Sequence, residues 1–242
     1  MDPESRIGQE TLDAIGRFDT CMIANAIETF EVRLRNIGFT DSSIRSMFPD
    51  LPPMVGYATT ARVRAGDPPV RGRIYHDRAD WWNNILAMPA PRIVVLEDMD
   101  KVRGTGAFLG DMHAAILKAL GCSGFVTDGA VRELPAIRQM GLRLFASNVT
   151  VSHAYAHIFD FGAPVRIGGL EIRPGDLLHG DQHGLISIPT RIASDVASVA
   201  AKLKETEKRV ISLCQSTDFS IEKLRNLIRE TNERDPTPAR KS

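Results

Sequence analysis

The sequence has no excess of charge of either sign. Its 242 residues carry 30 basic and 30 acidic side chains, so the formal net charge is zero. A chain without net charge has no global electrostatic attraction for nucleic acid or for an acidic membrane surface. We therefore expect neither as a partner, and any functional charge must be local.

Long apolar runs are also missing. No stretch approaches the roughly 20 residues that span a bilayer, and the longest candidate, residues 93–96, has the length of a short strand. The first ten residues, MDPESRIGQE, show no basic segment followed by an apolar run, so we expect no secretory signal. These two absences predict a cytoplasmic protein.

Cysteine is scarce. Cys21, Cys122 and Cys214 are widely spaced and form no CxxC pair. An odd number without close pairs argues against a disulfide framework and against a structural zinc site. We expect all three to be buried as small apolar side chains.

The remaining composition, 43% hydrophobic and 25% charged, is typical of a globular domain. Apolar spacing predicts two short helices within residues 8–30, with a cap at Asp19-Thr20, and a Gly/Pro-rich loop over 36–55. Further elements are expected as follows: a strand at 56–63, a helix ending before Pro89, a strand at 93–98, a helix at 112–120, a strand at 124–127, a helix at 133–140 and a strand at 142–146. This alternation indicates parallel pairing with right-handed crossovers.

The last third of the chain has a different pattern. Residues 164–189 hold short β-type runs between glycines, which predicts strands without intervening helices. A long amphipathic helix is expected over 191–213 and a second helix over about 220–231. The apolar face of the long helix consists of Ile192, Val196, Val199, Leu203, Val210 and Leu213.

The most informative segment begins at Gly110-Asp111 and ends at Arg132-Glu133. A Gly-Asp pair at a helix start presents backbone N–H groups beside a carboxylate, which suits a small anion and a hydrated cation. We expect Arg132 and Glu133 just past the end of the strand that closes at Thr127, where open α/β sheets bind ligands. The alternative is that Asp111 is only a helix cap and that Arg132 and Glu133 form a solvated pair.

The glycines favour the pocket, because they cluster where the backbone must turn tightly or approach a ligand. Together the motifs resemble one family, which contains the regulator of ribonuclease E activity A and the class II 4-hydroxy-4-methyl-2-oxoglutarate/4-carboxy-4-hydroxy-2-oxoadipate aldolases. The motifs are Gly110-Asp111, Gly121-x-x-Gly124, Asp128-Gly129-x-x-Arg132, Gly168-Gly169-x-x-x-x-Pro174-Gly175-Asp176 and Asp181-x-x-Gly184-x-x-x-x-Pro189.

The resemblance runs from about residue 18 to 190 and implies a fold. That fold is a layered α/β/β sandwich, similar to a swivelling domain, with flanking N-terminal helices and a C-terminal helical extension. Residues 1–190 would form the α/β domain and 191–242 the extension. It also implies a homotrimer or a hexamer with its sites at subunit interfaces.

The resemblance further implies a site. Arg132 would bind a small 2-oxo acid and stabilise the pyruvate enolate, and Glu133 would bind Mg²⁺ or Mn²⁺ with water-mediated help from Asp111. Gly110 and the backbone of Met112 and His113 would bind the substrate carboxylate. The family's metal ligand is usually aspartate, so Glu133 is a departure: it keeps the hard oxygen donors but moves the carboxylate by about 1.5 Å.

The implied function is that of a divalent-metal-dependent lyase that cleaves a 4-hydroxy-2-oxo acid to pyruvate through an enolate. Oxaloacetate decarboxylation passes through the same enolate and would be a second activity. The alternative is a non-catalytic trimeric regulator that binds a partner enzyme. The altered metal ligand favours this second interpretation.

The histidines other than His113 are not among these site residues. His153 and His157 are four residues apart but lack the glutamate of an HExxH zinc helix, so we expect no metal there. The segment 179–183 is either a hairpin turn near the surface or a polar rim to the pocket. His76 is expected to serve packing or a subunit contact.

Overall fold

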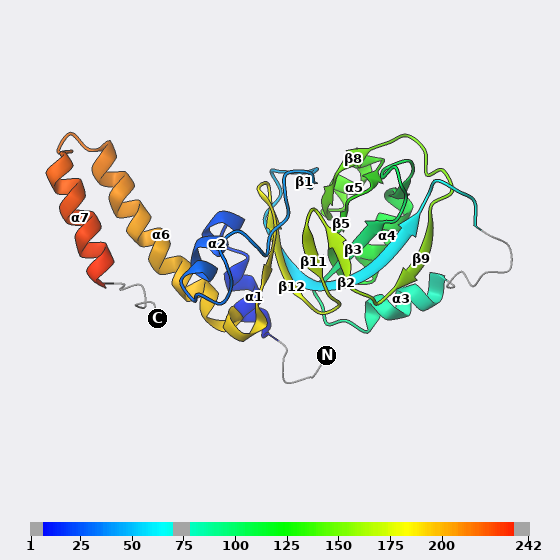
Figure 1. The fold of residues 1–242 in the computed structure, drawn as a ribbon, viewed down its shortest axis with the longest axis horizontal. Coiled ribbons are helices and arrows are strands. Elements are labelled where there is room, and N and C mark those ends of the chain that lie inside the picture. The colour runs from blue at the N-terminus through cyan, green and yellow to red at the C-terminus, as the bar shows by residue number, and fades with distance from the viewer. Residues whose placement is uncertain (1–6, 70–77, 235–242) are drawn as a thin grey trace.

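The computed structural model describes residues 7–69 and 78–234. Among them, an eight-stranded mixed sheet has the order β1-β7-β5-β3-β2-β12-β13, with β9 pairing the second half of β2 (Figure 1). Its strands are β1 (Arg45–Ser46), β2 (Met54–Arg64), β3 (Arg92–Asp98), β5 (Cys122–Thr127), β7 (Arg143–Ala146), β9 (His157–Phe161), β12 (Leu177–Asp181) and β13 (Gly184–Ile188). The predicted parallel pairing is confirmed, since β2, β3, β5 and β7 run parallel.

The sheet is covered differently on its two faces. Helices α3 (Arg78–Leu86), α4 (Asp111–Ala119) and α5 (Leu134–Gln139) bury Trp81, Leu117 and Ile137 in one apolar cluster with β3 and β5. A hairpin of β10 (Val165–Ile167) and β11 (Leu170–Ile172) joins a second cluster with Val95 and Val126. The continuous apolar run of β3 is therefore that of a strand buried on both faces.

Three strands of this sheet stop and then resume in a second, smaller sheet. β4 (Ala107–Leu109), β6 (Ala130–Val131) and β8 (Asn148–Val149) follow β3, β5 and β7 along the chain, and they pair in parallel in the order β4-β6-β8. The small sheet thus repeats the strand order of the large one. Each pair of strands is separated by a break, the shortest being the single residue Ser147.

Polar side chains satisfy the backbone at these breaks. The carboxylate of Asp128 accepts the N–H of Asp98 at 2.8 Å, and Asp98 in turn accepts the N–H of Gly104 at 2.7 Å. The hydroxyl of Ser147 donates to the carbonyl oxygens of Asp128 and Gly129. Burial raises the pKa of Asp128 to about 6, although the Arg103 guanidinium lies 2.6 Å from its second oxygen.

The N-terminal helices form a third apolar cluster, at the end of the sheet where β12 and β13 lie. They are α1 (Gln9–Ile15) and α2 (Thr20–Glu28), and the side chain of Asp19 accepts the N–H of Met22 at 2.8 Å. Both predicted helices and the predicted cap are confirmed. The two helices bury Ile15 and Ile23 against β12, β13 and the first part of the long C-terminal helix.

His179 lies inside this contact. Neither expectation for segment 179–183 holds for it, because His179 is fully buried within β12 rather than in a turn or a rim. Its Nε2 donates to the carbonyl oxygen of Phe18 at 3.1 Å, so its Nδ1 accepts from the Thr20 hydroxyl at 3.0 Å. The imidazole therefore connects β12 to the start of α2. Of the two histidines in this segment, only His183 lies in the hairpin turn, next to Gln182.

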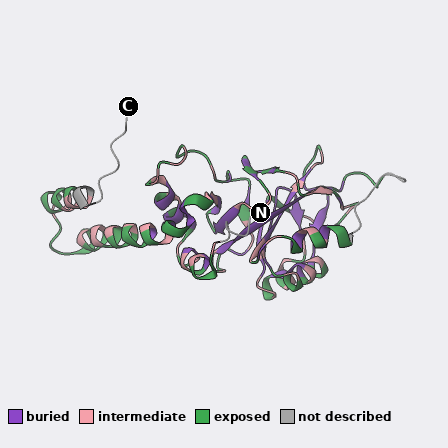
Figure 2. Ribbon diagram, turned by 90° about the horizontal axis from the view of Figure 1, so that it is seen from below, coloured by how far each residue is buried: buried purple, intermediate pink, exposed green. Residues whose placement is uncertain are grey.

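The C-terminal helices extend away from the sheet (Figure 1). After a short 3₁₀ turn at Thr190–Ile192, α6 (Ala193–Gln215) leads to α7 (Ile221–Arg234), which runs back beside it. The predicted helices exist, but the predicted apolar face of α6 is only partly buried: among the described side chains of residues 201–231 none is buried (Figure 2). We call residues 201–231 the helical arm.

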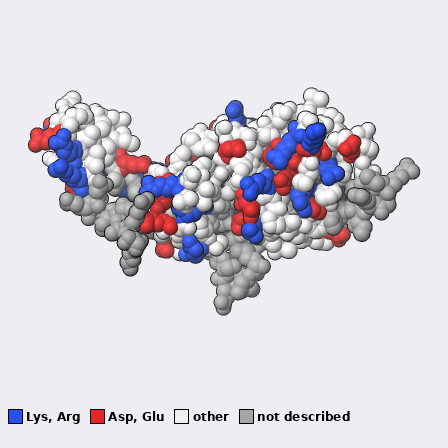
Figure 3. Space-filling model, in the orientation of Figure 1, with Lys and Arg blue, Asp and Glu red and all other residues white. Residues whose placement is uncertain are grey.

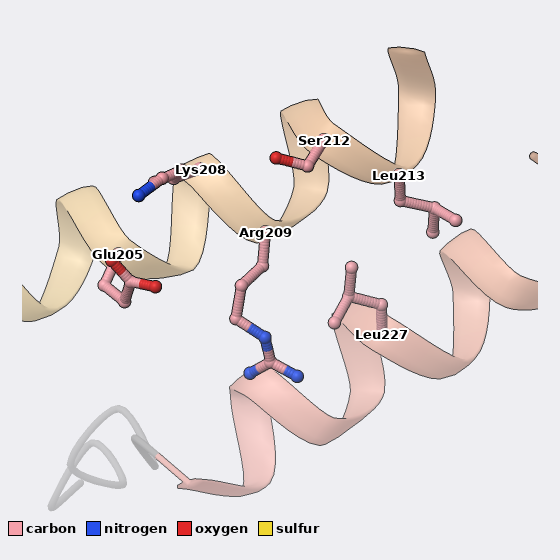
Figure 4. Close-up of a pocket in the computed structure, with 6 residues that line it drawn as sticks. All are labelled: Glu205, Lys208, Arg209, Ser212, Leu213 and Leu227. Atoms are coloured by element: carbon pink, nitrogen blue, oxygen red, sulfur yellow. The ribbon is translucent and has the colours of Figure 1, made fainter. Parts of the chain in front are cut away.

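The two helices of the arm enclose a groove of about 450 Å³ (Figure 4). Leu213 and Leu227 face one another across it, while Arg209 reaches toward α7 and pairs with Glu230 at 3.2 Å. Four apolar side chains of the arm are more than 40% exposed: Ile211, Phe219, Ile221 and Ile228. The arm therefore has no core of its own within the described chain.

The cysteine expectation is right for one residue and wrong for two. Cys122 is buried in β5, whereas Cys21 and Cys214 are exposed. Cys214 is exposed because it lies on the arm, and Cys21 because it points outward from α2. No described helix is long and apolar enough to cross a membrane.

The buried His179 makes stability depend on pH. Burial lowers its pKa to about 4 from 6.5, so between these values the unfolded chain binds more protons than the folded one. The stabilisation by neutral His179 is complete above pH 6.5 and is lost as the pH falls toward 4, about 3 kcal/mol in all. We predict that His179→Gln removes this slope from the free energy of unfolding, measured by urea denaturation. His183→Gln, at the exposed turn, should retain it, and equal slopes in both variants would contradict the assignment.

The two halves of α6 should respond differently to the same truncation. Val196 is fully buried, whereas Val210 lies on the arm. We predict that Val196→Ala lowers the free energy of unfolding by about 1–3 kcal/mol and that, in chains diluted to monomers, Val210→Ala changes it by less than about 0.5 kcal/mol. Chemical denaturation of both variants at low protein concentration measures the difference. An equal loss at Val210 in the monomer would contradict the exposed position of the arm.

Candidate functional site

The small sheet brings together the residues that the sequence analysis selected. β4 ends at Leu109 and is followed by Gly110 and α4, while β6 ends at Val131 and is followed by Arg132 and Glu133. The N–H of Arg132 donates to the carbonyl oxygen of Leu109 at 3.2 Å, which holds the two strand ends together. The expected position needs one correction: Arg132 and Glu133 follow β6, because the chain resumes a strand after the break at Asp128-Gly129.

Glu133 has an unusual backbone and two polar contacts. Its φ of 58° and ψ of 36° place it in the left-handed region, which non-glycine residues adopt infrequently. One carboxylate oxygen accepts the N–H of Asp111 at 2.9 Å. The other lies 3.4 Å from the Arg132 guanidinium. The carboxylate of one strand end thus caps the helix that begins at the neighbouring strand end.

Arg132 is half-buried between this carboxylate and the segment after β8. Its Nη1 donates to the carbonyl oxygen of Val151 at 3.5 Å. Sequence reasoning did not identify Val151, since nothing in its own sequence neighbourhood marks it. Only the pairing of β8 with β6, and the N–H of Thr150 donating to Val131, bring it beside the arginine.

The N-terminus of α4 supplies the backbone groups proposed for anion binding. Besides the N–H of Asp111, the N–H of Met112 donates to the Asp111 carboxylate at 2.6 Å. The side chain of Met112 is 59% exposed. The His113 ring packs 4.9 Å from the ring of Phe108, so it belongs to the inner side of the helix. The His113 ring thus faces Phe108, and the backbone N–H of Met112 lies at the helix start beside the Asp111 carboxylate.

The donor chemistry fits a hydrated divalent cation. Asp111 and Glu133 carry two exposed carboxylates at the same helix start, and the Glu133 carboxylate accepts the backbone N–H of Asp111. Mg²⁺ is commonly bound by one or two carboxylates and completes its shell with water and substrate oxygens. No cluster of three or more metal-ligating side chains occurs within the described ranges. A cation at this site would thus depend on water and on ligand oxygens.

Backbone contacts hold the rings of His153 and His157. His153 and His157 lie in a loop and at the start of β9, and the Nδ1 of each is 2.7 Å from a backbone carbonyl oxygen. His76 lies outside the described residues. On the face shown in Figure 3, acidic and basic side chains are interspersed over the sheet and the helices.

Comparisons with known proteins agree with the motifs. The sequence profile of the RraA-like family, described as Aldolase/RraA, matches residues 20–187. A protein of Halalkalibacterium halodurans named "Putative 4-hydroxy-4-methyl-2-oxoglutarate aldolase" is 31% identical over 163 residues, which are 66% of this chain and 72% of that protein.

Two solved structures share the fold. An uncharacterized protein from Pseudomonas syringae pv. tomato superposes with a TM-score of 0.71 at 24% identity, over 91% of this chain and 94% of that one. Streptomyces coelicolor RraAS2, described as an unusual member of the RNase ES inhibitor RraA family, gives 0.64 at 21% identity, over 84% and 96%. These likenesses confirm a mixed α/β fold with C-terminal helices. With the profile match over residues 20–187, they show that the chain belongs to the RraA-like family, which contains both aldolases and regulators.

Proposed function

We propose that this protein is a metal-dependent lyase that cleaves a 4-hydroxy-2-oxo acid and releases pyruvate. The observation that carries the proposal is the meeting of Arg132, two carboxylates and the N-terminus of α4 at the ends of β4 and β6. A guanidinium and helix amides bind carboxylates, and carboxylates bind hard cations. The relative named as a 4-hydroxy-4-methyl-2-oxoglutarate aldolase supports the same reaction class.

Asp111 and Glu133 are the residues that would hold the cation, Mg²⁺ or Mn²⁺. When bound, such an ion supplies Lewis acidity that polarises the 2-oxo group of the substrate. The protein's own part is to fix the geometry: α4 presents its first amides, and Arg132 is held by Val151 and Glu133.

The proposed cleavage breaks the bond between C3 and C4. The 4-hydroxyl loses its proton, the new carbonyl forms at C4, and the electron pair of the broken bond becomes the enolate of pyruvate, which is then protonated at C3. Arg132 stabilises the charge that develops on the enolate oxygen. The backbone at Gly110, Met112 and His113 orients the substrate carboxylate, and Asp111 holds the water that accepts the hydroxyl proton.

Oxaloacetate is a second proposed substrate. Its decarboxylation releases CO₂ from C4 and leaves the same pyruvate enolate at C3. A site that stabilises this enolate through Arg132 therefore serves both reactions. The two reactions differ in one step: aldol cleavage must remove the proton of the 4-hydroxyl, whereas decarboxylation has no such proton to remove.

A non-catalytic regulator is the second candidate. The observation that favours it is the internal use of Glu133, whose two oxygens are already engaged by the Asp111 N–H and by Arg132. A protein in which these contacts were permanent would have no cation site. It would act by binding a partner enzyme; Streptomyces coelicolor RraAS2 is described as a member of the RNase ES inhibitor RraA family.

We propose a homotrimer or a hexamer as the working form. The arm supports this proposal, because amphipathic helices in globular proteins are stabilised mainly by packing of their apolar face. Here that face includes Ile211, Ile221 and Ile228 and has no cover within the described chain. Sedimentation equilibrium should give the mass of three or six chains, and a monomer would contradict the proposal.

Replacing Arg132 by lysine is the main test of the site. The substitution keeps a positive charge but loses the planar fork that spans Val151 and the enolate. We predict a fall in kcat of about 100-fold or more, measured by coupling pyruvate release to NADH oxidation. Arg17→Lys, at an exposed position after α1, is the matched control and should retain the wild-type rate.

The same assay separates the lyase from the regulator. A panel of 4-hydroxy-2-oxo acids and oxaloacetate is supplied with Mg²⁺ or Mn²⁺, and each rate is repeated with EDTA. We expect chelator-sensitive pyruvate release from at least one substrate. If no member of the panel gives it, the lyase assignment is wrong and the regulator is favoured.

A further inference from the structure

The carboxylate of Glu133 occupies a place suited to a ligand carboxylate. It bridges the first amide of α4, at 2.9 Å, and the guanidinium of Arg132, at 3.4 Å, with one oxygen for each donor. Helix N-termini and arginine forks are the two protein groups that most often bind a carboxylate. In this conformation the protein fills its own anion site.

The local backbone is adapted to this contact. Gly110 has φ −125° and ψ −170°, an extended conformation that any residue can adopt. A side chain there would nevertheless collide with the Glu133 carboxylate, so the missing Cβ makes room for it. The left-handed backbone of Glu133 is the second adaptation. Such uncommon backbone conformations often mark functional sites.

The contact is also weak enough to be exchanged. The side chains of Arg132 and Glu133 are 30% and 39% exposed, and ion pairs in contact with water contribute little to stability. The N–H of Met112 is likewise held only by the neighbouring carboxylate of Asp111. A competing carboxylate or a cation can therefore displace these contacts without unfolding the helix start.

We propose that Glu133 is an internal gate that occupies the substrate-carboxylate site until a divalent cation draws it away. This inference rests on the proposed function, because the same cation and the same 2-oxo acid are involved. One carboxylate cannot cap α4, pair with Arg132 and ligate a cation at once. Cation binding therefore frees the Asp111 amide and Arg132, so the cation and the 2-oxo acid bind cooperatively.

Linkage makes this cooperativity measurable. If the cation raises the affinity for the 2-oxo acid by some factor, the 2-oxo acid raises the affinity for the cation by the same factor. We expect a factor of about ten or more in the wild type. Aspartate at position 133 keeps the negative charge but is shorter by one carbon–carbon bond, about 1.5 Å. Its carboxylate therefore does not reach the Asp111 amide. In Glu133→Asp the site is open without a cation.

The experiment measures pyruvate binding by titration calorimetry on the full chain, with EDTA and with saturating Mg²⁺. Without a cation, Glu133→Asp should bind pyruvate about tenfold more tightly than the wild type. Saturating Mg²⁺ should increase the pyruvate affinity of Glu133→Asp by a smaller factor than it increases that of the wild type. Mn²⁺ binding is followed by electron paramagnetic resonance with and without pyruvate. Pyruvate should increase the Mn²⁺ affinity of Glu133→Asp by a smaller factor than that of the wild type. Glu31→Asp is the matched control: Glu31 is an exposed glutamate with φ 51°, so it reports the effect of the substitution on left-handed backbone.

The outcomes separate the gate from the proposed function. Equal or weaker pyruvate binding by Glu133→Asp without a cation overturns the gate, while pyruvate release in the coupled assay would leave the lyase intact. If neither protein binds pyruvate with or without Mg²⁺ and no pyruvate is released, both are overturned. Thermal unfolding of the two variants confirms that each is folded, and Glu133→Gln, which keeps the reach but not the charge, should bind Mn²⁺ more weakly.

Discussion

The interruption of three parallel strands is the constraint on which the site depends. β3, β5 and β7 stop at one level and resume as β4, β6 and β8, which leaves backbone groups without sheet partners inside the protein. Unpaired buried backbone groups are costly, so side chains must replace the missing bonds. Asp128 does so for Asp98, and Ser147 for two carbonyl oxygens. Because the break is fixed, the ends of β4 and β6 remain in register and Gly110 meets Arg132.

The motif Asp128-Gly129-x-x-Arg132 therefore combines two different tasks. Its aspartate is almost fully buried and supports the break, whereas its arginine lies two strand residues further on and faces the site. Burial raises the pKa of Asp128 to about 6, and the exposed Arg103 favours the ionised form from the other side. The proposed chemical role belongs to Arg132, and the position of Arg132 depends on the break that Asp128 supports.

The sequence predicts the elements well where local signals and packing agree. The cap at Asp19, the buried run of β3 and the glycines around α4 lead to the observed helices and strands. The predictions are wrong where exposure depends on distant parts of the chain. His179 is buried because α2 packs on β12, and the apolar face of α6 emerges from the sheet after Ala200. Val151 reaches Arg132 only because β8 pairs with β6. A strand of two residues gives too little sequence pattern to predict that pairing.

Glutamate at position 133 gives one carboxylate two alternatives. An aspartate there could ligate a cation but would be too short to reach the first amide of α4. The extra methylene of glutamate lets its carboxylate either accept that amide or turn toward a cation. In the proposed gate, the departure from the usual residue shifts an equilibrium between these two positions. The exposed Arg132–Glu133 pair is weak, so the preference is set by small energies. In the proposed mechanism, a cation that gains a charged ligand and a substrate that gains an arginine and a helix end both favour the same displaced glutamate. Gly110 leaves room for the Glu133 carboxylate at the helix start, so the contact forms without a steric clash.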